Sequence, residues 1–128
     1  MVIKKHFEAL NDQQKRYAHY ISRAAFTGTR ITLRQVSPES ENIYDFIIEL
    51  YKASNGDWVA LQKKAGITDE DLKYFLEYSG MFLGNCGNYK GFGDAKFVPR
   101  CPESAFAALA ATSPAAEKYY KATDGAIL

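Results

Sequence analysis

Residues that start and stop α-helices recur along the whole chain, and this punctuation constrains the fold more than any other feature of the sequence. Asn11 and Asp57 are residue types whose side chains accept hydrogen bonds from the first N–H groups of a helix. Thr68 begins a capping-box pattern, and Gly66 is a common helix end. Apolar residues recur at intervals of three and four between these signals. The sequence therefore predicts a mainly α protein.

We expect four to six helices. The sharpest start is Ser37-Pro38-Glu39, where serine is placed to cap the helix and proline takes its first position. Residues 28–35 either extend the first helix or form an extended segment, since they include β-branched side chains and Gly28. The expected helices cover 12–27, 38–54, 58–65, 69–83, 103–111 and 114–122.

A long glycine- and aromatic-rich loop is expected at about residues 84–101. It holds four of the nine glycines and has no helical period. Its aromatic residues Tyr89, Phe92 and Phe97 favour an ordered conformation. Two interpretations remain open: a connector whose phenylalanines fill the core, or turns whose free N–H groups bind an anion or a peptide carboxylate.

Composition excludes several function classes. The 128 residues carry 16 Lys+Arg against 15 Asp+Glu, so the chain lacks the basic surface that nucleic-acid binding requires. Its apolar runs are too short to cross a membrane, and no apolar segment follows the charged N-terminus as in a secretory signal. We expect one domain, 1–128, in the cytoplasm, with Cys86 and Cys101 as reduced thiols.

No catalytic or metal-binding residue can be assigned from the residues alone. His6 and His19 are thirteen positions apart, and the sequence contains none of the local zinc-binding motifs. Cys86 has no histidine near it in the sequence to activate it as a nucleophile. We therefore expect neither a catalytic residue nor a cofactor in this chain.

Three blocks of sequence go beyond composition, and they resemble the N-terminal segment of the dipeptidyl-peptidase III family of zinc exopeptidases. They appear in the order and at about the spacing found in that family. Residues 112–117 are more loosely similar to fungal members. The blocks are Gln14-Lys-Arg-Tyr-Ala-His-Tyr-Ile-Ser-Arg-Ala-Ala-Phe26, Arg34-Gln-Val-Ser-Pro-Glu-Ser40 and Gly87-Asn-Tyr-Lys-Gly-Phe-Gly-Asp-Ala-Lys-Phe-Val-Pro99.

The resemblance implies a cytosolic enzyme of two lobes that releases dipeptides from the N-termini of short peptides. This chain would be a helical, incomplete N-terminal part of its lower, substrate-binding lobe. In the family, two histidines of a His-Glu-x-x-x-His helix and a later glutamate bind zinc, and the motif glutamate activates water. This chain contains no such motif, so the resemblance implies a segment that is inactive alone.

The resemblance also implies three substrate-binding residues. Phe92 matches a family phenylalanine that lines the substrate cleft, and Asn88 and Tyr89 match its neighbours. A place for Phe92 in the core is the alternative. The alternative for the whole chain is a non-catalytic helical interaction module derived from the family.

The expected partners are short peptides for the longer enzyme, and a catalytic lobe or a second copy for this chain. We expect the stripes Ile43/Phe46/Ile47/Leu50 and Phe75/Phe82/Leu83 to exceed what the chain can bury, which would leave an apolar docking patch.

Overall fold

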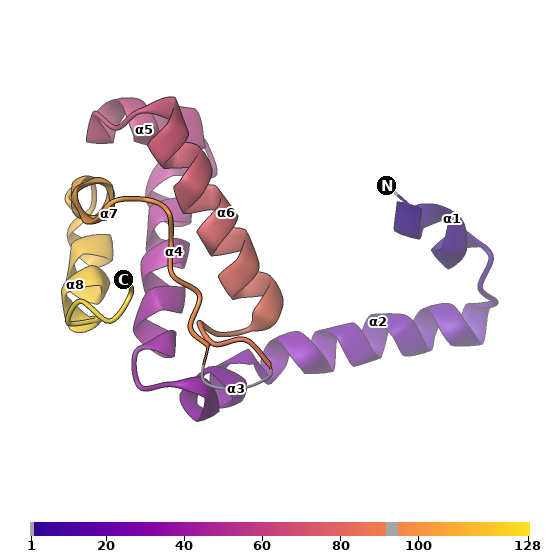
Figure 1. The fold of residues 1–128 in the computed structure, drawn as a ribbon. Helices are drawn as coiled ribbons and strands as arrows, with labels where there is room; N and C mark the ends of the chain where they lie inside the picture. Colours follow the sequence, from indigo (N-terminus) through magenta and orange to yellow (C-terminus); the bar gives the residue numbers. More distant parts are fainter. Residues whose placement is uncertain (1, 92–94) are drawn as a thin grey trace. The chain divides into compact units, whose positions relative to one another are not determined.

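The computed structural model describes residues 2–91 and 95–128, which form eight helices and no strand within these ranges. The expected mainly α class is therefore confirmed. A single isolated antiparallel bridge joins Tyr89 to Lys96 in the same ranges. The helices are α1 (Val2–Glu8), α2 (Asp12–Thr27), α3 (Thr29–Val36), α4 (Ser40–Ser54), α5 (Trp58–Ala65), α6 (Asp69–Asn85), α7 (Glu103–Ala110) and α8 (Pro114–Ala122) (Figure 1).

Most of the sequence signals for helix ends are confirmed by hydrogen bonds. The Asn11 side chain accepts a bond from the Gln14 N–H at 2.9 Å, and the Gln14 side chain accepts one from the Asn11 backbone N–H at 3.0 Å. Thr68 and Asp71 form the same reciprocal pair at the start of α6. At the end of α5, Gly66 has φ +70°, a conformation that glycine adopts without strain.

The start of α4 differs from the prediction. Ser37 is not its N-cap: the helix begins at Ser40, and Glu39, the residue before it, makes no side-chain capping bond. The Ser37 hydroxyl instead donates to Asn88 Oδ1 at 2.9 Å. Ser37 therefore bonds to Asn88, which is 51 positions away in the sequence, and does not cap the helix.

The expectation of four to six helices is too low, because the punctuation does not mark α1 or α3. The backbone at Gly28 keeps a right-handed helical conformation, and its N–H donates to Ala24 O at 3.0 Å. Leu33 of α3 is fully buried in the hydrophobic core. This burial accounts for a helix over β-branched residues with weak helix preference, because tertiary packing overrides local propensity.

The chain divides into two compact units, residues 1–31 and 32–128. The first contains α1, α2 and the first residues of α3. The second contains the remainder of α3 and the helices α4–α8, with α8 alongside α4 (Figure 1). That residues 1–128 form one region of a larger lobe stays a prediction.

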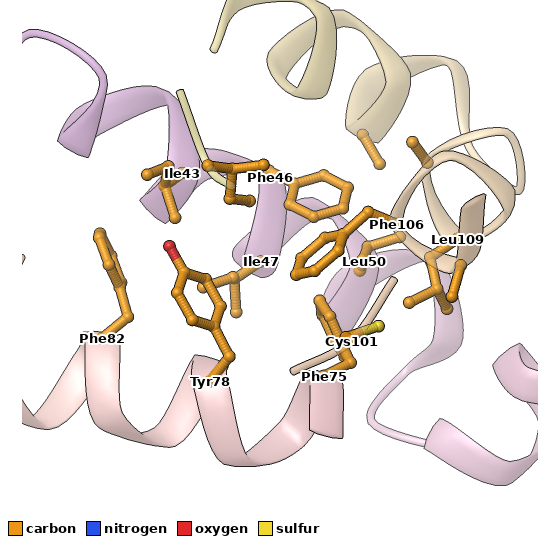
Figure 2. Close-up of a cluster of buried hydrophobic side chains, with 14 of the residues drawn as sticks. Ile43, Phe46, Ile47, Leu50, Phe75, Tyr78, Phe82, Cys101, Phe106 and Leu109 are labelled. Carbon is orange, nitrogen blue, oxygen red and sulfur yellow. The ribbon is translucent and has the colours of Figure 1, made fainter. Parts of the chain in front are cut away.

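The core of residues 32–128 is built on aromatic side chains from separate helices. The rings of Phe46 in α4 and Phe75 in α6 lie 6.2 Å apart between centroids. Phe106 of α7 lies 5.7 Å from Phe75 and 5.9 Å from Tyr78, with ring planes close to perpendicular in both pairs. Figure 2 shows these side chains pointing toward one another from α4, α6 and α7. Edge-to-face contacts of this kind add to the free energy gained by burial.

The apolar stripes expected to form a docking patch are in this core. Leu83 is the exception, at 42% exposed. The prediction of a patch on these two stripes is wrong, because α4, α6, α7 and α8 cover one another. The six buried members are Ile43, Phe46, Ile47, Leu50, Phe75 and Phe82, each at most 2% exposed.

Phe106→Ala should lower the free energy of unfolding by about 3–5 kcal/mol, because it removes a fully buried ring and leaves a cavity among four other aromatic residues. Val59→Ala is the control, since Val59 is 55% exposed and its truncation should change stability by about 0.5 kcal/mol or less. Urea unfolding followed by tryptophan fluorescence measures both. Equal effects of the two variants would contradict the assignment of Phe106 to the core.

Candidate functional site

The segment between α6 and α7 is the long loop that the sequence predicts, and it leaves α6 through two unusual backbone conformations. Cys86 ends the helix with φ +56°, and Gly87 follows with φ +154°. A Cβ on Gly87 would lie 2.7 Å from Val36 Cγ1, closer than real Cβ atoms approach other atoms. Glycine is therefore required where the loop passes the end of α3.

Asn88 is the centre of a buried hydrogen-bond network at the base of this loop. Its side chain is fully buried. The hydroxyls of Ser37 and Ser40 lie 2.9 and 3.0 Å from its Oδ1 atom and 2.8 Å from each other. These serines flank the turn between α3 and α4, so the Asn88 amide joins the loop to the start of α4.

The nitrogen of the Asn88 amide bonds to one member of a charged pair, Glu39 and Lys96. Its Nδ2 donates to Glu39 Oε1 at 2.7 Å. Lys96 Nζ lies 3.8 Å from the same oxygen and also donates to the carbonyl of Ala126. The Lys96 ammonium thus connects the loop and Glu39 to the chain near Ala126. A buried amide with both of its ends bonded resists displacement, because moving it would leave unpaired polar groups away from water.

Backbone bonds hold the two sides of the loop together. The Phe97 N–H donates to Asn88 O at 2.7 Å, and the Lys90 N–H donates to Ala95 O at 2.8 Å. Phe97 packs against the hydrophobic core, as the connector interpretation expects. The base of the loop is therefore an ordered pair of short segments.

The network shifts the titration of Glu39. Burial acts to raise the pKa of this carboxyl, but the hydrogen bonds from Asn88, the backbone and Ser37, together with the charge of Lys96, lower it below its ordinary value of 4.5. The charged form of Glu39 is the form that the fold stabilises.

The structure describes two of the three residues expected to bind substrate, Asn88 and Tyr89, which are neighbours in the sequence. Asn88 is buried with its amide bonded to protein groups. Tyr89 is half-buried, and its carbonyl oxygen accepts a bond of 2.6 Å from Asn85 Nδ2. Phe92 lies outside the described residues. A role of these residues in substrate binding stays a prediction.

Sequence reasoning missed the partners of the Asn88 side chain, which are Ser37, Ser40 and Glu39, and the pairing of Glu39 with Lys96. The partners on the α3–α4 turn lie 48 to 51 positions from Asn88, so no local spacing marked them.

Other reactive side chains fit structural roles. Burial raises the pKa of the Cys101 thiol to about 11, and this group stays protonated at neutral pH. The Tyr78 hydroxyl is buried without a hydrogen-bond partner among the described residues, and burial raises its pKa also. Among the described residues, neither Cys86 nor Cys101 forms a disulfide.

A hollow of about 440 Å³ lies beside the outgoing side of the loop. The Arg100 guanidinium lies 4.4 Å from the centroid of the Tyr74 ring and pairs with Glu77. These bonds already occupy the charged groups of the hollow. Its lining residues are Tyr74, Glu77, Tyr78, Met81, Val98, Pro99 and Arg100.

The residues present do not fit the zinc ion that the resemblance implies. In residues 2–91 and 95–128, no three His, Cys, Asp or Glu side chains form a group that could hold a metal. Over the same ranges, every helix is too short or too polar to cross a bilayer.

Comparison with known proteins yields one consistent group of relatives, while no protein-family model matches the chain. Dipeptidyl peptidase 3 of Rattus norvegicus is 38% identical over 114 residues, which are 88% of this chain and 15% of the rat protein. The Homo sapiens protein of the same name is 37% identical over 114 residues, 88% of this chain and 16% of its own length. That of Dictyostelium discoideum is 35% identical over 97 residues, 76% of this chain and 14% of its own. The chain thus spans about one seventh of the length of these curated relatives.

Asn88→Ala should lower the free energy of unfolding by about 1–3 kcal/mol, because it leaves the buried hydroxyls of Ser37 and Ser40 without their acceptor. Asn55→Ala is unsuitable as a control because Asn55 adopts a left-handed conformation. Asn42→Ala is better matched, since the Asn42 amide makes a single exposed bond to Ala122 O. Urea unfolding measures both variants, and an equal or smaller effect at Asn88 would contradict a structural role of the buried network.

Glu39 should make the fold sensitive to acid. Because its pKa is lower in the folded chain than in the unfolded chain, its contribution to stability is present above the unfolded pKa and is lost as the pH falls through the folded pKa. The unmodified chain should therefore lose more stability than Glu39→Gln between about pH 5 and pH 3. Urea midpoints across this range measure the difference, and parallel pH profiles would show that Glu39 does not contribute.

Proposed function

We propose that this chain is the N-terminal part of a dipeptidyl peptidase 3-like zinc exopeptidase, which releases dipeptides from the N-termini of short peptides in the cytoplasm. The observation that carries the proposal is the match of most of the chain to proteins of that one name from mammals, a sea anemone and a slime mould. The looser likeness of residues 112–117 to fungal members belongs to the same proposal.

In this proposal the chain supplies part of the substrate-binding lobe. Phe92 provides an apolar wall for a peptide side chain. Asn88 and Tyr89 lie at the base of the loop. Because the amide of Asn88 is buried and bonded to protein groups, we infer that it acts by positioning the loop. The ligands of the zinc ion that supplies the hydrolytic chemistry come from outside this chain.

A second candidate function is a non-catalytic helical interaction module. Residues 32–128 bury nearly all of their predicted apolar stripes in a core of their own. A segment with such a core has the means to fold without a larger lobe. Activity of the segment inside a longer enzyme separates the two candidates.

The isolated chain should hydrolyse no dipeptidyl naphthylamide substrate, with or without added zinc. A catalytic zinc site uses about three protein ligands and an open position, and the described residues provide no such set. Release of naphthylamine measured by fluorescence tests this. Zinc-dependent turnover that disappears in His6→Ala or His19→Ala would overturn the expectation.

A chimera tests the proposed function directly. The matched segment of the rat protein is replaced by this chain, and zinc-dependent dipeptide release is compared with that of the unmodified rat protein. We expect the chimera to be active. An inactive chimera, folded or unfolded, would contradict the proposal and favour the interaction module.

The same chimera tests Phe92. Phe92→Ala should raise KM about tenfold, the effect of losing roughly 1.4 kcal/mol of apolar contact with the peptide. Val98→Ala is the matched control, since Val98 is on the same loop and is 67% exposed. Equal KM values for the two variants would contradict the proposal that Phe92 lines the substrate cleft.

A further inference from the structure

The first unit exposes an apolar helix face that its own residues do not cover. None of the residues of α2, all of which the structure describes, is buried. Tyr17, Tyr20 and Ile21 are 70%, 66% and 52% exposed. At about 100° per residue they lie on one side of the helix. These three residues, with Leu10 just before the helix, are the α2 apolar face.

A shallow hollow of about 430 Å³ lies on this face. Its lining combines apolar side chains with two amides and holds no charged group. Lys15 lies about 160° round the helix from Tyr17, whereas Arg16 and Arg23 border the face beside Tyr20. The chemistry of the face therefore suits a largely apolar protein surface. The lining residues are Leu10, Gln13, Gln14, Tyr17 and Ala18.

The comparison with the relatives indicates which protein would supply the surface that contacts the α2 apolar face. A match over 88% of 128 residues leaves about 15 unmatched, so residues 17–112 lie inside it wherever it begins. Tyr17, Tyr20 and Ile21 are therefore in the part of the chain that is similar to the rat protein. About 85% of the rat protein lies outside the match, and this part supplies surface that the present chain lacks.

We propose that the α2 apolar face is the docking surface for the remaining part of a dipeptidyl peptidase 3-like protein. This inference rests on the proposed function and names the partner of the segment. Burial of Tyr17, Tyr20 and Ile21 against that part removes apolar area from water, which is the principal favourable contribution to protein association. An exposed face of this kind marks an interaction site.

The test uses the rat chimera with a matched pair of substitutions on one helix. Tyr17→Ser removes an aromatic side chain from the face. Phe26→Ser removes an exposed aromatic side chain, 79% exposed, nine positions away and about 180° round the helix. Tyr17→Ser should lower the melting temperature of the chimera by about 1–2 °C, and Phe26→Ser by less than about 0.5 °C. In the isolated chain neither substitution should change the melting temperature.

The outcomes separate the two proposals. An inactive chimera overturns the proposed function and this inference with it. An active chimera in which Tyr17→Ser and Phe26→Ser melt alike overturns the inference alone. Destabilisation of the isolated chain by Tyr17→Ser overturns it also, because the face would then be covered by the chain itself.

Two other occupants are distinguished by the same pair of variants. A discrete dimer of the isolated chain in light scattering, abolished by Tyr17→Ser and retained by Phe26→Ser, would assign the face to a second copy. Flotation of the chain with phosphatidylserine–phosphatidylcholine vesicles, abolished by Tyr17→Ser and retained by Phe26→Ser, would show that the α2 apolar face binds a lipid surface. Either result overturns the proposal.

Discussion

The buried amide of Asn88 is the interaction on which the arrangement of residues 32–128 around the loop depends. It bonds to Ser37, Ser40 and Glu39 on the turn before α4, and its backbone carbonyl pairs with Phe97 on the opposite side of the loop. A long loop between helices is entropically costly to order. The hydrogen bonds of the buried Asn88 amide offset this entropic cost, because breaking any of them would leave a buried polar group without a partner. The loop thereby holds one conformation at its base.

The same contacts connect the loop to the rest of its unit. Gly87 allows the chain to pass Val36 closely, and Lys96 joins Glu39 to the carbonyl of Ala126. Separate parts of residues 32–128 thus meet at one carboxylate and one amide. In the proposed peptidase, this is how a helical framework would hold an aromatic loop against a substrate.

The two units differ in how far they bury their apolar residues. Residues 32–128 place the phenylalanines of α4, α6 and α7 in a shared core, whereas α2 keeps its tyrosines exposed. Both stripes have the same helical spacing in the sequence. Periodicity shows that a face is apolar, but the partner of that face depends on which other elements reach it. For this reason the sequence pattern predicts a docking patch on stripes that the structure buries.

The sequence by itself determined the helical class, most helix ends and the position of the long loop, because these depend on local bonds such as Asn11 with Gln14 and Thr68 with Asp71. The resemblance to a peptidase family was also available from the sequence, in blocks such as residues 87–99. Only the tertiary structure decided that residues 29–36 are helical, that Ser37 bonds to Asn88 instead of capping α4, and that Asn88 is buried. Each of these depends on contacts between residues far apart in the chain, whose free energy no local pattern records.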